Sequence, residues 1–172
     1  MDRTNEVVHA CQREHPTLDA SSLLLLLRFD GLARSLEPFL RDVLEPLELA
    51  PSEQRVLLAL APASQVERET PTRLAQRLGH TTGGMTKILR RLEERGLVAR
   101  STDPDDGRGR RVELTARGDA TLGRALRALA LAAGHRLASL PPAARDEIAD
   151  SLGRFAAAFA PASPPPDADS GE

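Results

Sequence analysis

Apolar residues recur at intervals of three and four over most of the chain, which is the spacing of one face of an α-helix. The longest run predicts a helix over residues 22–45, which Pro46 ends. Its apolar positions are Leu25, Phe29, Leu32, Leu36, Phe39, Leu40 and Val43. Pro38 lies inside this run, so we expect a kink or a loosened turn there. Asp19 or Ser21 is placed to cap the first turn of the helix.

The same spacing predicts further helices over residues 3–14, 52–60, 116–140 and 143–159. The helix over 116–140 follows Thr115, whose side chain can cap it, and it ends before Pro141 and Pro142. Residues 61–69 are expected to form a polar connector. Residues 161–172 include four Pro and no large apolar residue, so we expect them to be disordered.

Two short helices are predicted next to one another in the middle of the chain. Thr70 can cap the first helix, and Gly79 is placed to end it. After a three-residue turn, the second helix covers residues 82–95 and is closed by Gly96. Two short helices joined by a tight turn that contains Gly form the helix-turn-helix pattern.

A β-hairpin is predicted directly after this helix pair. Residues 97–101 and 110–114 alternate between apolar and polar positions, as strands do. They flank residues 102–109, which are rich in Asp, Gly and Pro. This arrangement is typical of a hairpin with a long charged tip. The expected fold is therefore mainly α-helical with one small hairpin.

Composition excludes several classes of protein. No apolar run approaches the roughly 18 residues of a membrane-spanning helix, and the first residues, MDRTNEVVH, are too polar for a secretory signal. The 172 residues include one Cys, no Trp, no Tyr and four Phe. These counts exclude an internal disulfide framework and favour a reducing, cytoplasmic location. They also disfavour sites that stack bases or sugars on aromatic rings.

The net charge of −2 hides an uneven distribution of charge. Residues 71–118 hold eleven basic and six acidic residues, a net charge of +5, whereas the remainder holds 12 basic and 19 acidic residues, a net charge of −7. A basic segment within an acidic chain indicates contact with nucleic acid, although an ordinary mixed surface can carry the same charges. Arg outnumbers Lys by 22 to 1 along the whole chain, which we attribute to a GC-rich genome.

The second short helix has two chemically different faces. The residues predicted to face the core recur with helical spacing and are Met85, Ile88, Leu89 and Leu92. The opposite face carries short polar residues followed by basic ones, namely Thr82, Gly83, Thr86, Lys87 and Arg90. Short side chains let a helix enter the major groove of DNA, where hydroxyl and basic groups reach base edges and phosphates.

The hairpin tip adds a second basic element. Arg108, Arg110 and Arg111 lie at or beside the turn, and an arginine on a thin projecting loop can enter the narrow minor groove. Asp106 precedes Arg108 by two residues, close enough to orient its guanidinium group. A helix-turn-helix followed at once by such a hairpin is a more specific signal than either motif alone.

These two motifs resemble those of the MarR family of winged-helix regulators. TRLAQRLGHTTGGMTKILRRLEERGLVAR, residues 72–100, is similar to the family's helix-turn-helix, and DPDDGRGRRVELTARG, residues 103–118, is similar to its wing. The resemblance extends from about Leu18 to Phe159, and the wing is its most specific part. The chain departs from the family at Gly107, where a second Arg is usual.

The resemblance implies a winged helix-turn-helix fold, mainly α with a small β-hairpin wing, that dimerises through its N- and C-terminal helices. The implied segments are N-terminal dimerisation helices (1–48), a DNA-binding domain (49–118), C-terminal dimerisation helices (119–160) and a disordered tail (161–172). The chain's own residues also favour a dimer, because the first and last long helices hold more apolar residues than a small winged domain can cover. All four Phe residues lie there, at Phe29, Phe39, Phe155 and Phe159.

The function that follows is a transcription regulator, expected to be a repressor that binds a palindromic operator in double-stranded DNA and is released by a small-molecule effector. The residues expected to contact DNA are Thr81, Thr82, Gly83, Thr86, Lys87, Arg90, Asp106, Arg108, Arg110 and Arg111. By resemblance, Arg108 enters the minor groove and Asp106 positions it.

The N-terminal segment over 10–28 is similar to a subgroup of the family that has an extra N-terminal helix and includes urate-responsive repressors. This chain has Cys11 where the subgroup carries Trp, and Arg55 where it carries Asp, so the sequence does not name the effector. Cys11 is also a candidate redox sensor, because Arg13 and His15 lie near it, although an inert thiol is the simpler interpretation.

Two alternative functions stay open. One is a thiol-based redox-sensing regulator acting through Cys11, and the other is a protein-interaction dimer whose winged domain does not bind DNA. His9, Cys11 and His15 do not extend to a complete metal-ligand motif, and no Ser, His and Asp have the spacing of a catalytic triad. We therefore expect no metal, no cofactor and no enzymatic activity.

Overall fold

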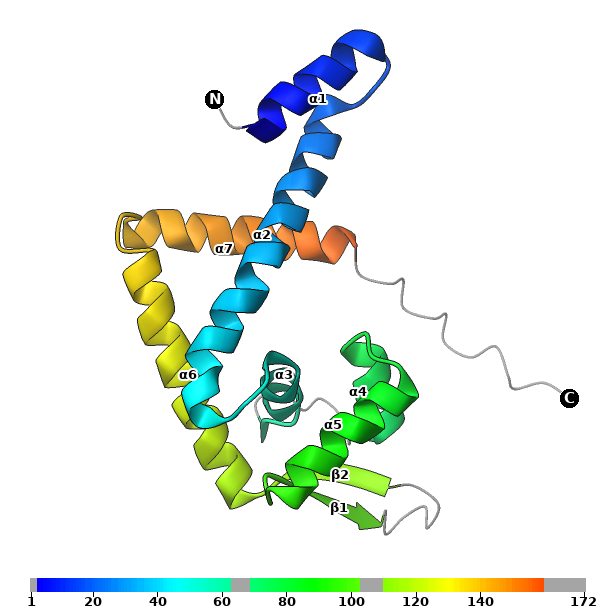
Figure 1. The fold of residues 1–172 in the computed structure, drawn as a ribbon, viewed down its shortest axis with the longest axis vertical. Coiled ribbons are helices and arrows are strands. Elements are labelled where there is room, and N and C mark those ends of the chain that lie inside the picture. The colour runs from blue at the N-terminus through cyan, green and yellow to red at the C-terminus, as the bar shows by residue number, and fades with distance from the viewer. Residues whose placement is uncertain (1–2, 63–68, 103–109, 160–172) are drawn as a thin grey trace, which may run out of the picture. The chain divides into compact units, whose positions relative to one another are not determined.

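The computed structural model describes residues 3–62, 69–102 and 110–159. Its elements in chain order are α1 (Arg3–Glu14), α2 (Ala20–Leu44), the 3-10 helix η1 (Glu45–Leu47), α3 (Pro51–Ala59), α4 (Pro71–Arg77), α5 (Thr82–Glu94), β1 (Val98–Thr102), β2 (Arg110–Leu114), α6 (Ala116–Arg136) and α7 (Pro142–Ala158) (Figure 1). The predicted fold class, mainly helical with one small antiparallel hairpin, is confirmed over these residues. None of the described helices is long and apolar enough to cross a membrane.

The chain divides into two compact units, residues 1–130 and residues 131–172. The first unit contains the helices from α1 to α5, the hairpin and most of α6. The second contains the last residues of α6 and all of α7. The expected disordered tail lies outside the described residues.

Asp19 determines where α2 begins. Its Oδ1 atom accepts hydrogen bonds from the backbone N–H groups of Ser21 and Ser22, at 3.1 and 3.2 Å, so Asp19 rather than Ser21 is the cap. The helix therefore starts at Ala20, two residues before the predicted start, and it continues through Pro38 to Leu44. α1 packs on α2 and buries Val8.

One aliphatic core lies under α3, α4, α5, the hairpin and the first turns of α6. Its most deeply buried large side chains are Leu44, Val56, Leu57, Leu60, Leu74, Met85, Leu89, Leu92, Leu97 and Val112. α4 contacts α5 and β2, and α5 contacts α3 and β1 (Figure 1). Because the core contains no aromatic side chain, its packing depends on the close fit of branched aliphatic residues.

Two glycines end the helices of the central pair, as predicted. Gly79 and Gly96 both have φ +66°, a left-handed conformation that costs glycine little and other residues more. After Gly79, the N–H of His80 donates to the carbonyl of Ala75 at 2.8 Å. After Gly96, the N–H of Leu97 donates to the carbonyl of Leu92 at 2.9 Å. Each glycine thus turns the chain and satisfies carbonyl groups that the helix end leaves open.

The hairpin is fixed to the rest of the first unit at its base. β1 and β2 pair antiparallel, with Val98 opposite Leu114 and Thr102 opposite Arg110. The N–H of Val112 also donates to the carbonyl of Glu69 at 3.0 Å, which attaches the hairpin to the segment before α4. The position of the hairpin is therefore fixed by this additional hydrogen bond as well as by the pairing of its two strands.

Thr115 caps α6, as predicted, and joins it to the start of β1. Its Oγ1 atom accepts from the N–H of Gly118 at 3.0 Å and donates to the carbonyl of Gly96 at 2.7 Å. Its N–H donates to the carbonyl of Leu97 at 3.2 Å. Gly118 packs so closely here that an added Cβ atom would lie 1.9 Å from the Leu97 carbonyl oxygen. The hairpin and α6 are thus held in a close contact that requires glycine.

α6 ends earlier than predicted, at Arg136 instead of residue 140. Beyond it the hydrogen bonds shorten to three-residue steps, from the N–H of Ala138 to His135 and from that of Leu140 to Leu137. Leu140 precedes a proline, which disfavours the helical conformation at the preceding residue. The helix therefore tightens and stops before the two prolines are reached.

Gly118→Ala should lower the free energy of unfolding by about 1 to 3 kcal/mol, the cost of forcing extra volume into a packed site. The new methyl group would overlap a backbone carbonyl, which cannot move aside without shifting β1. Gly123→Ala in the same helix is the control, because its Cβ would meet only the flexible Arg127 side chain, at 3.5 Å. That variant should gain roughly 0.5 to 1 kcal/mol from helix propensity. Urea denaturation measures both, and equal responses would contradict the close contact.

The capping interactions of Asp19 make the stability that this residue contributes depend on pH. Hydrogen bonds from the Ser22 and Ser21 hydroxyls, the Ser22 bond contributing most, lower the pKa of Asp19 from 3.8 to about 2. Because the folded pKa lies below the unfolded one, the stabilisation is complete above pH 4 and is lost as the pH falls towards 2. NMR titration should show this lowered pKa, and Ser22→Ala should raise it. An ordinary pKa in the wild-type chain would exclude the cap.

Candidate nucleic-acid interface

α4 and α5 form a helix-turn-helix in which each helix begins at a threonine cap. The Oγ1 atom of Thr70 accepts from the N–H of Arg73 at 3.2 Å, as predicted. The Oγ1 atom of Thr81 accepts from the N–H of Gly84 at 3.1 Å. The hydroxyl group of Thr81 is therefore engaged in starting α5, although the sequence placed Thr81 among the residues that contact DNA.

α5 has one buried face and one exposed face. Its buried residues are Met85, Ile88, Leu89 and Leu92, the four that the sequence predicts. Its exposed residues include Thr82, Gly83, Thr86, Lys87 and Arg90, which we call the polar face of α5. The structure therefore brings together, on one exposed surface, all the α5 residues that the sequence assigns to major-groove contact.

The two basic residues of the polar face, Lys87 and Arg90, differ in their ion pairing. Lys87 has no ion-pair partner among the residues that the structure describes. Arg90 lies 3.5 Å from Glu94 one turn later, and both side chains are largely exposed. Exposed pairs of this kind contribute little free energy, so a phosphate can displace Glu94 easily. The hydroxyl of Thr86 donates to the carbonyl of Thr82 at 2.9 Å and keeps its lone pairs as acceptors.

The predicted wing residues are only partly described. Arg111 is half-buried and lies opposite Ser101, and the backbone of Arg110 pairs with Thr102 at the open end of the hairpin. Asp106 and Arg108, predicted to form the tip, lie outside the described residues. The structure therefore describes strands β1 and β2 at the base of the wing, and Asp106 and Arg108 stay a prediction.

The net charge of +5 overstates the basic charge that is open to a ligand. Ion pairs within the fold engage Arg77 with Glu69, Arg90 with Glu94, Arg91 and Arg95 with Glu53, and Arg100 with Glu93. Glu53 and Glu69 lie outside the basic segment as counted from the sequence, yet they neutralise charges within it. The basic charge open to a ligand is therefore smaller than the count, and Lys87 and Arg90 carry part of it on the polar face of α5.

A buried acid holds α4 in place. Glu69, which the sequence places in a polar connector, is in fact buried and pairs with Arg77 in the last turn of α4. Arg77 also donates to the carbonyl of Ala59 at 3.1 Å, at the end of α3. This placement corrects the prediction for the end of the connector, since a carboxylate can be buried where an arginine from the next helix meets it.

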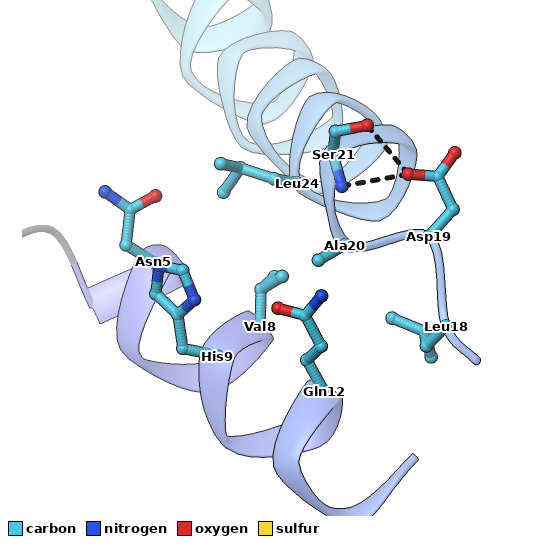
Figure 2. Close-up of a pocket in the computed structure, with 9 residues that line it drawn as sticks. All are labelled: Asn5, Val8, His9, Gln12, Leu18, Asp19, Ala20, Ser21 and Leu24. Carbon is cyan, nitrogen blue, oxygen red and sulfur yellow. Dashed lines mark hydrogen bonds between the residues drawn. The ribbon is translucent and has the colours of Figure 1, made fainter. Parts of the chain in front are cut away.

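The N-terminal helices form a hollow of about 480 Å³ (Figure 2). From α1 it is lined by Asn5, Val8, His9 and Gln12, and from the other side by Leu18, Asp19, Ala20, Ser21 and Leu24. Cys11, the candidate redox residue, is half-buried on α1 and does not line this hollow. Among the described residues, no group of three or more His, Cys, Asp or Glu is placed to hold a metal ion.

Arg55, which stands where the urate-responsive subgroup carries an acid, pairs across two helices. Its Nη2 atom lies 2.7 Å from Oε2 of Glu37, joining α3 to α2. Both side chains are about two-fifths exposed, so the pair lies at the surface. This exposed ion pair links α3, which precedes the helix-turn-helix, to the long helix α2.

Comparison with known proteins supports the resemblance found in the motifs. The sequence model of the MarR family matches residues 48–109. No curated protein sequence matches the chain significantly. Among solved structures, the transcriptional regulator BldR from Sulfolobus solfataricus has a TM-score of 0.70 and is 24% identical over 81% of this chain and 96% of its own.

Two of the similar structures contain DNA. The transcriptional repressor CouR, bound to a 23-mer DNA duplex, has a TM-score of 0.68 and is 29% identical over 80% of this chain and 96% of its own. A complex of MepR from S. aureus with DNA has a TM-score of 0.61 and is 18% identical over 76% of this chain and 92% of its own. Residues 48–109 thus match the MarR family, and the described residues have the winged helix-turn-helix fold of these solved transcription regulators.

Proposed function

We propose that this chain is a homodimeric repressor of transcription that binds a palindromic operator in double-stranded DNA and is released by a small-molecule effector. The observation that carries the proposal is the polar face of α5. This helix buries four apolar side chains and leaves short polar and basic residues in solvent on the opposite side. CouR and MepR, which share the fold, were solved with DNA.

The first turn of α5 is suited to the major groove. Thr82 and Gly83 are short, so the helix end can approach base edges closely. The N–H groups of a helix start lack partners within the helix, and the helix dipole favours a phosphate there. Thr81 satisfies only the N–H of Gly84. Lys87 and Arg90 then extend basic charge along the same face, towards the DNA backbone.

The wing completes the proposed contact. By resemblance to the family, Arg108 enters the minor groove, Asp106 orients it, and Arg110 and Arg111 contact phosphates. The base of the hairpin is bonded to the segment before α4 and to the start of α6, which provides a rigid support for such a tip.

An apolar stripe on α2 supports a dimer. Leu25, Phe29, Leu32 and Leu36 are between 42 and 51% exposed, and their spacings of four, three and four residues place them along one side of the helix. α7 separately exposes Ile148 and Leu152. A contiguous apolar surface of this kind is unfavourable in water and is typical of an interface. A two-fold dimer would place two α5 helices roughly 34 Å apart, one turn of DNA.

The DNA-binding proposal is tested on duplexes that the wild-type chain selects from a random pool. Lys87→Gln should weaken binding and reduce the slope of log affinity against log salt by about 1, because one phosphate contact is lost. Arg108→Ala should weaken binding by about tenfold or more. Fluorescence anisotropy from about 50 to 200 mM salt measures both effects.

Arg34→Gln is the matched control for these variants, because Arg34 is an exposed arginine on α2 that pairs with Asp30. It should bind DNA as the wild type does. A wild-type chain that selects no duplex would instead favour a protein-interaction dimer. Binding that responds to peroxide in the wild type but not in Cys11→Ser would add a redox role.

Leu32→Lys should convert the dimer to a monomer, because it places a charge in the middle of the apolar stripe on α2. Light scattering after size exclusion should give twice the 18.5 kDa of one chain for the wild type and 18.5 kDa for the variant. Leu58→Lys is the control, since Leu58 on α3 is 40% exposed, close to the 42% of Leu32. A variant and control that both stay dimeric would place the interface elsewhere.

A further inference from the structure

A single buried carboxylate joins the start of α3 to α5. Glu53 is only 5% exposed, and its Oε2 atom accepts from the N–H of Ala50 at 3.0 Å. Its Oε1 atom lies 3.2 Å from Nε of Arg91, and its Oε2 atom lies 3.5 Å from Nη1 of Arg95. Both arginines are on α5 or at its end, one helical turn apart. The carboxylate therefore holds α5 at two points along its length.

We call the contacts of Glu53 with Arg91 and Arg95 the clamp. Arg95 also contacts the end of η1. Its Nη1 atom donates to the carbonyl of Glu48 at 2.6 Å, and its Nη2 atom donates to the carbonyl of Leu47 at 3.3 Å. Glu48 has φ +53°, a strained conformation for a residue with a side chain. One guanidinium group thus satisfies two carbonyls of the chain between α2 and α3, and it pairs with Glu53 at the same time.

The clamp restricts movements of α5 that the packing of the core leaves possible. Hydrophobic contacts are non-directional, so the burial of Met85, Ile88, Leu89 and Leu92 restricts a small rotation or slide of α5 only weakly. Arg95 donates a hydrogen bond to Glu53 and Arg91 forms an ion pair with it one turn earlier, so the two contacts together restrict both the rotation of α5 and its position along the axis. Arg91 lies in the second half of α5 and Arg95 caps its end, whereas Thr82, Gly83 and Thr86 lie in the first half.

We propose that Glu53 and Arg95 are positioning residues for base recognition by α5, a role that rests on the DNA-binding function proposed above. Base contacts depend on geometry and carry specificity, whereas phosphate contacts carry most of the affinity for any DNA and tolerate small displacements. Loss of the clamp lowers the preference for selected DNA over random DNA. It leaves the contribution of phosphates to binding largely unchanged.

The test compares Glu53→Gln, Arg95→Gln and the double variant with the wild type. Glutamine keeps the size of Glu53 and can still accept from the N–H of Ala50, but it lacks the charge that pairs with arginine. Affinities for a selected duplex and for a scrambled duplex of equal length are measured for each protein. The ratio of the two should fall by about tenfold in each single variant, the cost of one lost base contact.

This ratio separates positioning from mere destabilisation. Removing one partner of a buried ion pair destabilises a fold, and any unfolded fraction lowers both affinities by the same factor, so it leaves the ratio unchanged. The double variant should lose no more than the larger single effect, because both residues act through one clamp. Arg34→Gln, which breaks an exposed pair on α2, should keep the wild-type ratio.

A wild-type preference that both single variants retain would overturn the positioning role alone. Losses that add in full in the double variant would also overturn it, because two independent sites would then be acting. A wild-type chain with no preferred duplex would overturn the DNA-binding function itself, and the positioning role would fall with it.

Discussion

The burial of one face of α5 is the constraint on which the rest of the fold depends. Met85, Leu89 and Leu92 are among the most deeply buried side chains of the first unit. α5 contacts α3, α4 and β1, and its buried residues share one core with Val112 of β2 and with the first turns of α6. These elements cover only one face of α5, and the opposite face is left in solvent. The packing of the core thus also creates the surface that we propose for DNA binding.

Charge within the fold serves structure as much as recognition. Arg77, Arg95 and Arg100 are engaged by acids that lie far away in sequence or on another element. Such pairs orient helices, because the buried carboxylates of Glu53 and Glu69 are costly to leave unpaired. The basic groups that remain available on α5 are few, and they lie beside small residues. A compact basic surface of this kind favours close approach to DNA over diffuse electrostatic attraction.

Local features of the fold could be predicted from the sequence, whereas its long-range polar contacts could not. The caps Thr70 and Thr115 and the closing glycines Gly79 and Gly96 act on residues a few positions away, so short patterns identify them. Glu53 and Arg95 are 42 residues apart, and no local pattern relates them. The only signals were the position of Glu53 in the first turn after Pro51 and the one-turn spacing of Arg91 and Arg95. Those signals indicate a cap and a helix face, not a pair.

The exposed stripe on α2 bears on specificity as well as on stability. One α5 presents a few short side chains to a groove, and so small a set of contacts distinguishes few base pairs. In the proposed dimer, two copies bind as one body, so base contacts double while the entropy of association is lost only once. That gain requires the two α5 helices to be held at a fixed spacing and orientation. The apolar stripe would supply the spacing, and the clamp of Glu53 and Arg95 would supply the orientation within each copy. Recognition of a palindrome would therefore depend on residues that never touch DNA.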